Sequence, residues 1–141
     1  MKSVIVIGSG FAGLSAATFL AKEGYDVTIL EKNDQLGGRA RCWEKDGFKF
    51  DMGPSWYWMP DVFERYFASF GKEVSDLYNL IRLDPSYRVV YGPNDQEDQS
   101  PNMEELEAMF DKLDPGSGMR LRKFLKQAEY KYKVGIQDLV F

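Results

Sequence analysis

The feature that most constrains the fold is a G-x-G-x-x-G pattern formed by Gly8, Gly10 and Gly13. It follows residues 4–7, a β-branched run typical of a strand buried on both faces of a parallel sheet. From Phe11 onward the apolar residues recur with helical spacing, so the glycines are predicted to form a strand-to-helix turn. In such a turn the first glycine permits the bend and the second lets backbone approach a pyrophosphate. The third lets the helix pack against the strand.

A second strand and an acidic residue complete the predicted unit. Gly24 is placed to end the helix, residues 27–30 form another apolar run, and Glu31 follows it. A carboxylate at this position can accept hydrogen bonds from ribose hydroxyls and disfavours a 2′-phosphate, so NADP fits poorly. The start of the helix offers free N–H groups to phosphates. The sequence therefore predicts a dinucleotide-binding βαβ unit, with a ligand-free glycine turn as the alternative.

Composition excludes several kinds of chemistry within this chain. Its 141 residues suffice for one ordinary domain and include no histidine, which rules out histidine acid–base catalysis and histidine metal sites. Cys42 is the single cysteine, so no intrachain disulfide forms and no zinc site is expected. The net charge of −4 gives no indication of nucleic-acid binding. The start "MKSVIVIG" is too short for a signal-peptide core and is interpreted as mature protein.

A second glycine pair, Gly37 and Gly38, follows the acidic residue and precedes Arg39. Adjacent glycines permit close backbone approach, and arginine is a permanent cation suited to phosphate. The pair favours a cofactor that is longer than NAD. An ordinary turn after the polar residues 32–35 is the alternative, and the residues alone do not decide between the two.

The stretches "GSGFAGLSAA" and "ILEKNDQLGGRA" together resemble the N-terminus of the FAD-dependent amine oxidase and phytoene desaturase superfamily. The segment "GFKFDMGPSWYWMPDVFERYFASFGK" resembles the bacterial-type phytoene desaturases, or carotenoid desaturases, as do "LDPSYRVVYG" and "KYKVGIQDLVF". The resemblance covers nearly the whole chain. Gln35 and Cys42 depart from it, at positions where a basic and a hydroxyl residue are common.

This resemblance implies an α/β fold that begins with the N-terminal part of a Rossmann-like FAD-binding domain. Residues 1–55 would form that part, and residues 56–141 would begin a substrate-side helical region, with the sheet incomplete in this chain. The chain would be an N-terminal fragment that is inactive by itself. The residues expected to contact FAD are Gly8, Ser9, Gly10, Phe11, Ala12, Gly13, Glu31, Lys32, Gly37, Gly38, Arg39, Gly53, Pro54 and Ser55.

The implied activity is FAD-dependent desaturation of a carotenoid precursor such as phytoene. No catalytic residue and no metal are assigned. An isoprenoid substrate implies a cytoplasmic protein in peripheral contact with the cytoplasmic membrane. Alternatives are a carotenoid isomerase, a ketolase or an amine oxidase of the same superfamily, a stand-alone nucleotide-binding module, and an NAD-dependent dehydrogenase.

The segment after the glycine pair carries signals for a hairpin and a bend. Phe48 and Phe50 alternate with polar residues, with Gly47 at the predicted turn. Gly53 and Pro54 then bend the chain; the resemblance implies that they lie beside the flavin, and a purely structural bend is the alternative. The following aromatic block, residues 56–58, would line an isoprenoid site or pack in a core.

Three helices are predicted downstream. The first covers residues 62–70 with Asp61 as its N-cap, and the second has a capping box of Asn102 and Glu105. The third runs from about Asp114 to Lys133 and is basic, which suits a membrane surface or a solvated face. Residues 93–102 contain no apolar side chain and are interpreted as an exposed loop, although the resemblance implies a short strand near them.

Overall fold

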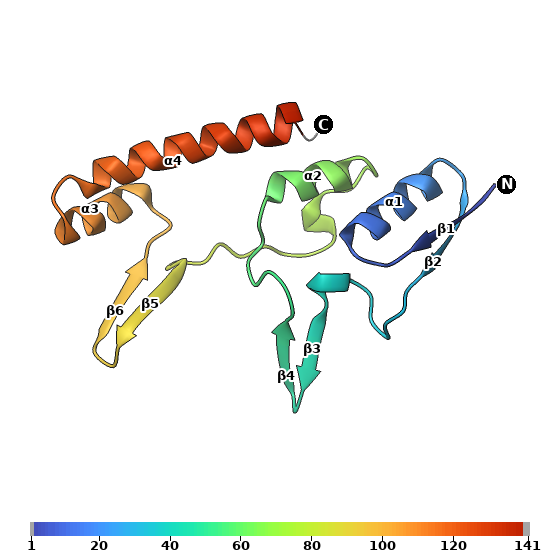
Figure 1. Ribbon diagram of the computed structural model, residues 1–141, viewed down its shortest axis with the longest axis horizontal. Coiled ribbons are helices and arrows are strands. Elements are labelled where there is room, and N and C mark those ends of the chain that lie inside the picture. Colours follow the sequence, from blue (N-terminus) through green and yellow to red (C-terminus); the bar gives the residue numbers. More distant parts are fainter. Residues whose placement is uncertain (1, 140–141) are drawn as a thin grey trace. The chain divides into compact units, whose positions relative to one another are not determined.

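The computed structural model describes residues 2–139, which divide into two compact units. The first unit ends at Leu77 and the second begins at Tyr78. Figure 1 shows that the strands are gathered in three small pairs and that helices occur in both units.

The first unit opens with the predicted βαβ arrangement. Strand β1 spans Ser3–Ile7, helix α1 spans Phe11–Lys22, and strand β2 spans Asp26–Leu30. The strands pair in parallel, in a register that runs from Ser3 opposite Asp26 to Ile7 opposite Leu30. This pairing confirms the Rossmann-like βαβ unit predicted from the glycine spacing.

One part of the strand prediction is wrong, because β1 is not buried on both faces. Side chains alternate between partly covered and exposed along the strand, and Ile5 and Ile7 are 64% and 86% exposed. Helix α1 packs against the sheet, and within residues 2–139 the sheet contains two strands. Val4 and Val6 are partly covered, whereas the alternate side chains remain open to solvent.

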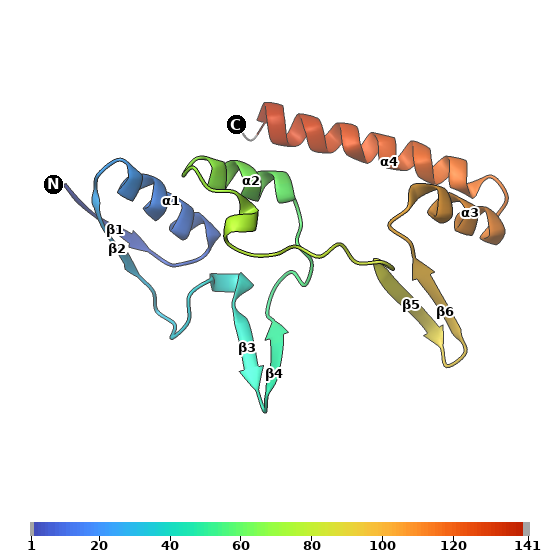
Figure 2. The same ribbon diagram turned by 180° about the vertical axis from the view of Figure 1, so that it is seen from behind.

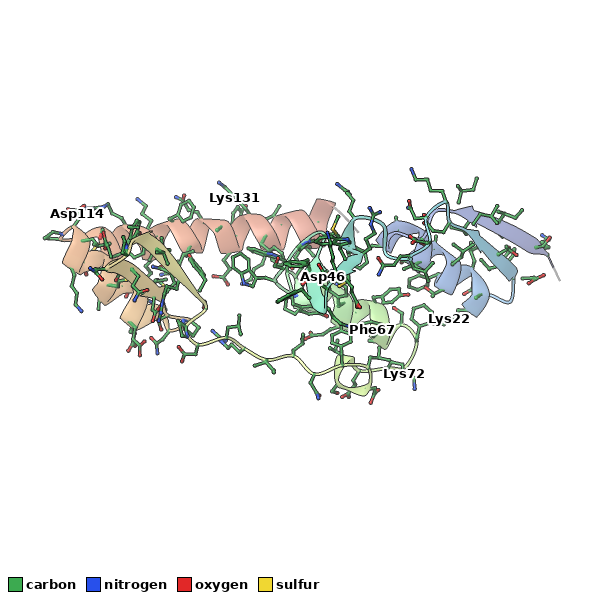
Figure 3. All side chains as sticks on the ribbon, turned by 90° about the horizontal axis from the view of Figure 1, so that it is seen from below. Lys22, Asp46, Phe67, Lys72, Asp114 and Lys131 are labelled. Atoms are coloured by element: carbon green, nitrogen blue, oxygen red, sulfur yellow. The ribbon has the colours of Figure 1, made fainter. Side chains whose placement is uncertain are left out.

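A β-hairpin follows a short 3₁₀ turn at Gly38–Ala40. Strands β3, Cys42–Lys45, and β4, Phe48–Asp51, pair antiparallel and leave a two-residue loop. Both loop residues, Asp46 and Gly47, have positive φ angles of 52° and 83°. An Asp-Gly loop with two positive φ angles matches the tight turn that suits the twist of a hairpin. The predicted hairpin is therefore confirmed, and Asp46 is labelled at its turn in Figure 3.

Helix α2, Pro60–Ala68, lies beside α1 in both Figure 1 and Figure 2. Its N-cap is Met59, so the predicted cap at Asp61 is wrong. Proline in the first turn presets the helical φ and needs no N–H partner, so the helix starts there. A further 3₁₀ turn spans Val74–Asp76.

Aromatic and polar contacts join α2 and the two residues that follow it to α1. The Phe19 ring lies 5.0 Å from the Phe70 ring and 5.9 Å from the Tyr66 ring, measured between centroids. The Tyr66 hydroxyl lies 2.6 Å from Thr18 Oγ1. Lys22, labelled in Figure 3, donates to the Ser69 carbonyl oxygen at 2.5 Å. These contacts fix α2 against the helix that begins at the glycine loop.

The second unit begins with an antiparallel pair, β5 (Tyr87–Gly92) and β6 (Asp95–Gln99). The interpretation of residues 93–102 as a loop is wrong, and the strand implied by the family resemblance is present. Arg88 on β5 holds Asp98 on β6 with two hydrogen bonds of 2.5 and 2.8 Å. Cross-strand charge pairing and exposed positions allow a strand without apolar residues.

Two helices complete the second unit: α3, Met103–Leu113, and α4, Ser117–Val134, which continues as a π-helical segment, Gly135–Leu139. Asn102 caps α3 as predicted, because its Oδ1 accepts from the N–H groups of Glu104 and Glu105. The reciprocal half of the capping box is wrong. The Glu105 carboxylate instead accepts from the Ser100 hydroxyl at 2.7 Å.

Candidate cofactor-binding site

Three segments of the first unit converge on one cleft of about 1040 Å³. They are the glycine loop after β1, the segment from Asn33 to Arg41, and the bend after β4. Protein clefts that hold organic ligands typically measure about 300–1,000 Å³, so this cleft suits a large ligand. Its lining residues are Gly10, Phe11, Ala12, Asn33, Gly37, Gly38, Arg39, Ala40, Arg41, Met52, Gly53 and Pro54.

The first glycine loop is shaped by two close backbone contacts. The Gly8 N–H donates to the Leu30 carbonyl oxygen at 2.7 Å, and Gly8 has a φ of +94°. A Cβ on Gly13 would overlap the Gly8 carbonyl oxygen, so only glycine allows α1 to start this close to β1. A Cβ on Gly10 would meet nothing within 4 Å. The Gly10 backbone therefore faces open space in the cleft, where a ligand can approach it.

The second glycine pair packs directly on the first loop. Gly37 donates its N–H to the Ser9 carbonyl oxygen at 2.9 Å. A Cβ on Gly38 would lie 3.1 Å from Gly10 Cα, and both glycines of the pair have positive φ angles, +102° and +60°. Glycine is the residue that tolerates both conditions. The pair is therefore one wall of the cleft and not merely a surface turn.

The bend after β4 closes a further side of the cleft. A Cβ on Gly53 would lie 2.5 Å from the Arg39 carbonyl oxygen, so the two backbones touch. The Met52 N–H donates to the Arg41 carbonyl oxygen at 3.0 Å. The Gly-Pro bend is thus held beside the arginine segment by contacts that a side chain at residue 53 would prevent.

The cleft carries positive charge. Arg39 and Arg41 both line it, and among residues 2–139 neither side chain has a hydrogen bond or ion pair. Helix α1 begins at the cleft with Gly10 as N-cap, no side-chain cap and no acidic residue in its first turn. Its free N–H groups and two arginines form a site suited to a diphosphate.

Glu31, at the end of β2, is held by four hydrogen bonds. Its Oε2 accepts from the Ser9 N–H at 2.8 Å and from the Ser9 hydroxyl at 2.7 Å. Its Oε1 accepts from the Asn33 N–H at 2.9 Å and from Asn33 Nδ2 at 2.7 Å. These donors stabilise the ionised form and lower the pKa of Glu31 to about 2, with the Ser9 hydroxyl as the largest cause.

The predicted site residues fall into three groups. Those that line the cleft are Gly10, Phe11, Ala12, Gly37, Gly38, Arg39, Gly53 and Pro54. Gly8, Ser9 and Gly13 shape the glycine loop, and Glu31 accepts hydrogen bonds from Ser9. Lys32 and Ser55, like these four residues, lie outside the lining. Their roles toward a cofactor stay predictions.

The sequence interpretation missed four lining residues: Asn33, Ala40, Arg41 and Met52. Each lies within two residues of a predicted segment. The R-A-R spacing of Arg39 and Arg41 was a signal for the second cation, because Arg41 directly follows the 3₁₀ turn Gly38–Ala40 that contains Arg39. The three remaining positions carry no comparable signal.

Two further features limit the chemistry of the described residues. They contain no group of three or more acidic or cysteine side chains placed to hold a metal ion. Within residues 2–139, no helix has the length and apolar character needed to span a bilayer. The positive charge and the helix start at the cleft suit a phosphorylated ligand.

The chain is similar to several known proteins. A family described as "NAD(P)-binding Rossmann-like domain" matches residues 6–73. Carotenoid 3,4-desaturase of Haloarcula japonica is 50% identical over 140 residues, which cover 99% of this chain and 28% of that protein. A 4,4′-diapophytoene desaturase of Staphylococcus aureus is 39% identical over 131 residues, which cover 93% of this chain and 26% of that protein.

The chain therefore spans about a quarter of the length of these curated relatives. Among solved structures, a fatty acid isomerase from P. acnes that produces CLA aligns with a TM-score of 0.40 and 32% identity. That alignment covers 52% of this chain and 18% of the isomerase. The sequence relatives confirm the predicted resemblance to carotenoid desaturases, and the family match confirms a Rossmann-like dinucleotide-binding unit.

Proposed function

We propose that this chain, a relative of the carotenoid and diapophytoene desaturases, supplies the dinucleotide-binding part of an FAD-dependent carotenoid desaturase. The observation that carries the proposal is the convergence of the two glycine segments and the Gly-Pro bend on one cleft. A βαβ unit needs only the first of these segments to bind a dinucleotide. The other two segments lengthen the cleft beyond what a shorter ligand would fill.

The size and the charge of the cleft support FAD as the ligand. The Gly10 backbone is open, Gly38 packs on it, and Arg39 and Arg41 have no partner among the described residues. These residues would hold the diphosphate together with the start of α1. Glu31 would accept from the ribose of the adenosine half. Gly53, Pro54 and Ser55 would lie beside the ring system, where a glycine permits close approach.

When bound, FAD would supply the redox chemistry by accepting two hydrogens from adjacent carbons of an isoprenoid, which creates a double bond. The chain's own residues then have to bind and orient the cofactor and exclude water from it. The sequence contains no histidine, and the mechanism asks for no acid–base residue from it. The catalytic contribution of this part is thus positional.

Exposed apolar side chains near the Gly-Pro bend support a carotenoid substrate such as phytoene. Met52, Trp56 and Trp58 are each more than half exposed, and the two indoles contact edge to face at 6.2 Å. An exposed apolar group beside a cofactor cleft suits a long hydrocarbon. Because such a substrate dissolves in lipid, we further propose a cytoplasmic location with peripheral membrane contact. The basic residues of α4 suit an anionic lipid surface.

The test is to purify the whole protein and identify the cofactor that acid releases, by absorption spectrum and mass. FAD is the expected product. The purified protein is then incubated with phytoene and, separately, with amines. Visible absorption from newly conjugated double bonds supports a desaturase. Release of NAD without flavin would overturn the cofactor, and peroxide formation with amines but no change in phytoene would overturn the reaction.

A further inference from the structure

We propose that Ser9 and Asn33 divide the Glu31 carboxylate between two tasks. Oε2 is a fixed support held by Ser9, and Oε1 is the acceptor that exchanges the Asn33 amide for a ribose hydroxyl. Ser9 is then a positioning residue that acts through Glu31. This inference rests on the proposed function, because it concerns the adenosine half of the same cofactor.

The support half is built into the glycine loop. Ser9 is 0% exposed, and its N–H and hydroxyl both donate to Oε2, at 2.8 and 2.7 Å. Its carbonyl oxygen accepts from the Gly37 N–H at 2.9 Å. A buried donor that loses its acceptor carries the full cost of desolvation, so Ser9 resists release of Oε2.

The exchange half lies on the open side. Asn33 is exposed and lines the cleft, and its side-chain amide donates to Oε1 at 2.7 Å. When this amide rotates away, water can satisfy it, so its departure leaves no buried donor unpaired. The Asn33 N–H, at 2.9 Å, keeps Oε1 in place during the exchange.

The count of acceptor sites makes the exchange necessary. An ionised carboxylate offers about four lone-pair sites, and Ser9 and Asn33 already supply four donors. A ribose hydroxyl can therefore reach Glu31 only by displacing one of them. The Asn33 amide is the donor that is exposed and belongs to the cleft.

The two substitutions are expected to act in opposite directions. Ser9→Ala frees Oε2 from its side-chain donor and lets the carboxylate turn, so ADP binding should weaken by about tenfold. Asn33→Ala removes the donor that competes with the ribose, so ADP should bind at least as tightly as to the unsubstituted protein. A merely structural role for both residues predicts losses of the same sign.

The experiment uses calorimetric titration of the purified whole protein, freed of cofactor, with ADP and with 2′,3′-dideoxy-ADP. The analogue keeps the diphosphate and lacks the hydroxyls that would meet Oε1. Ser9→Ala should weaken the binding of ADP more than the binding of the analogue. Ser69→Ala serves as the control, because that hydroxyl donates to the Arg65 carbonyl oxygen on α2, outside the cleft lining.

Equal weakening of ADP and its analogue by Ser9→Ala would overturn the positioning role of Ser9. Weaker ADP binding by Asn33→Ala than by the unsubstituted protein would overturn the exchange. Failure of the proposed function has a different signature. A protein that binds ADP but not FAD contradicts the flavin assignment, and the contrast between the two variants still tests the division of Glu31. Binding of neither ligand overturns both.

Discussion

Gly38 lies against Gly10, so close that a Cβ on Gly38 would be 3.1 Å from Gly10 Cα. The contact joins two glycine segments that are separated by the whole of α1 and β2. Through this contact the second glycine segment extends the cleft beyond the first glycine loop. The contact also gives a direct way to test the second glycine pair.

Gly38→Ala should lower FAD affinity by about tenfold or more, because the methyl group pushes the second segment away from the first. The matched control is Gly71→Ala. Gly71 has a similar φ, +67° against +60°, but a Cβ there would meet nothing within 4 Å. Both variants should lose about 1 kcal/mol of stability from backbone strain. Equal FAD affinity in the two variants, measured by flavin fluorescence titration, would contradict the role of the contact.

Substitution of Gly13 should mainly reduce stability, whereas substitution of Gly10 should mainly reduce FAD binding. Gly13→Ala places a methyl group on the Gly8 carbonyl oxygen, so we expect about 3 kcal/mol or more of lost stability in denaturant titrations. Gly10→Ala meets no protein atom within 4 Å and should fold nearly as well as the unsubstituted protein. Its methyl group instead enters the cleft, so FAD binding should fall. A Gly10→Ala protein with normal flavin content would refute the phosphate site.

Much of the first unit was predictable because its signals are local. The glycine spacing determines the turn, and Asp46 with Gly47 determines the hairpin. The strand β6 was not predictable from periodicity, because its side chains are held by cross-strand pairing and not by burial. The start of α2 was missed because Pro60 replaces a side-chain cap.

In the site, glycines were predictable because few residue types tolerate their backbone angles and contacts. Asn33 was not, and Arg41 was indicated only by its spacing from Arg39, because an asparagine or an arginine in a polar segment is usually solvated. Their roles depend on where the backbone places them, which is set by contacts such as Met52 with Arg41. Residue type alone does not encode that placement.

Arg41 should contribute to diphosphate binding alongside Arg39. Arg39→Gln and Arg41→Gln should each weaken FAD binding by about tenfold and make the affinity less dependent on salt concentration, because each removes one charge contact. Lys45→Gln, which removes a charge from the end of β3 outside the cleft lining, is the control and should change neither quantity. If Arg41→Gln showed the same FAD affinity and salt dependence as the control, Arg41 would have no role in diphosphate binding.

Glu31 should make the stability of the first unit depend on pH in the acid range. Its pKa in the folded protein is about 2, against an ordinary value of 4.5, because Ser9 and Asn33 donate to the carboxylate. Above pH 4.5 the ionised carboxylate contributes its full stabilisation. As the pH falls toward 2, the unfolded chain binds the proton first, so the contribution declines and is lost below the folded pKa.

The measurement compares the free energy of unfolding of the unsubstituted protein with that of Glu31→Gln between pH 7 and pH 2. The glutamine cannot ionise, and its amide group faces donors where the carboxylate accepted. The variant should therefore be less stable at neutral pH, with a difference that shrinks as the pH falls below about 4.5. Asp98, Glu107 and Glu129 also have lowered pKa values, and they are common to both proteins, so their contributions cancel in the difference. A difference that stays constant from pH 7 to pH 2 would show that the four hydrogen bonds do not hold Glu31 in its ionised form.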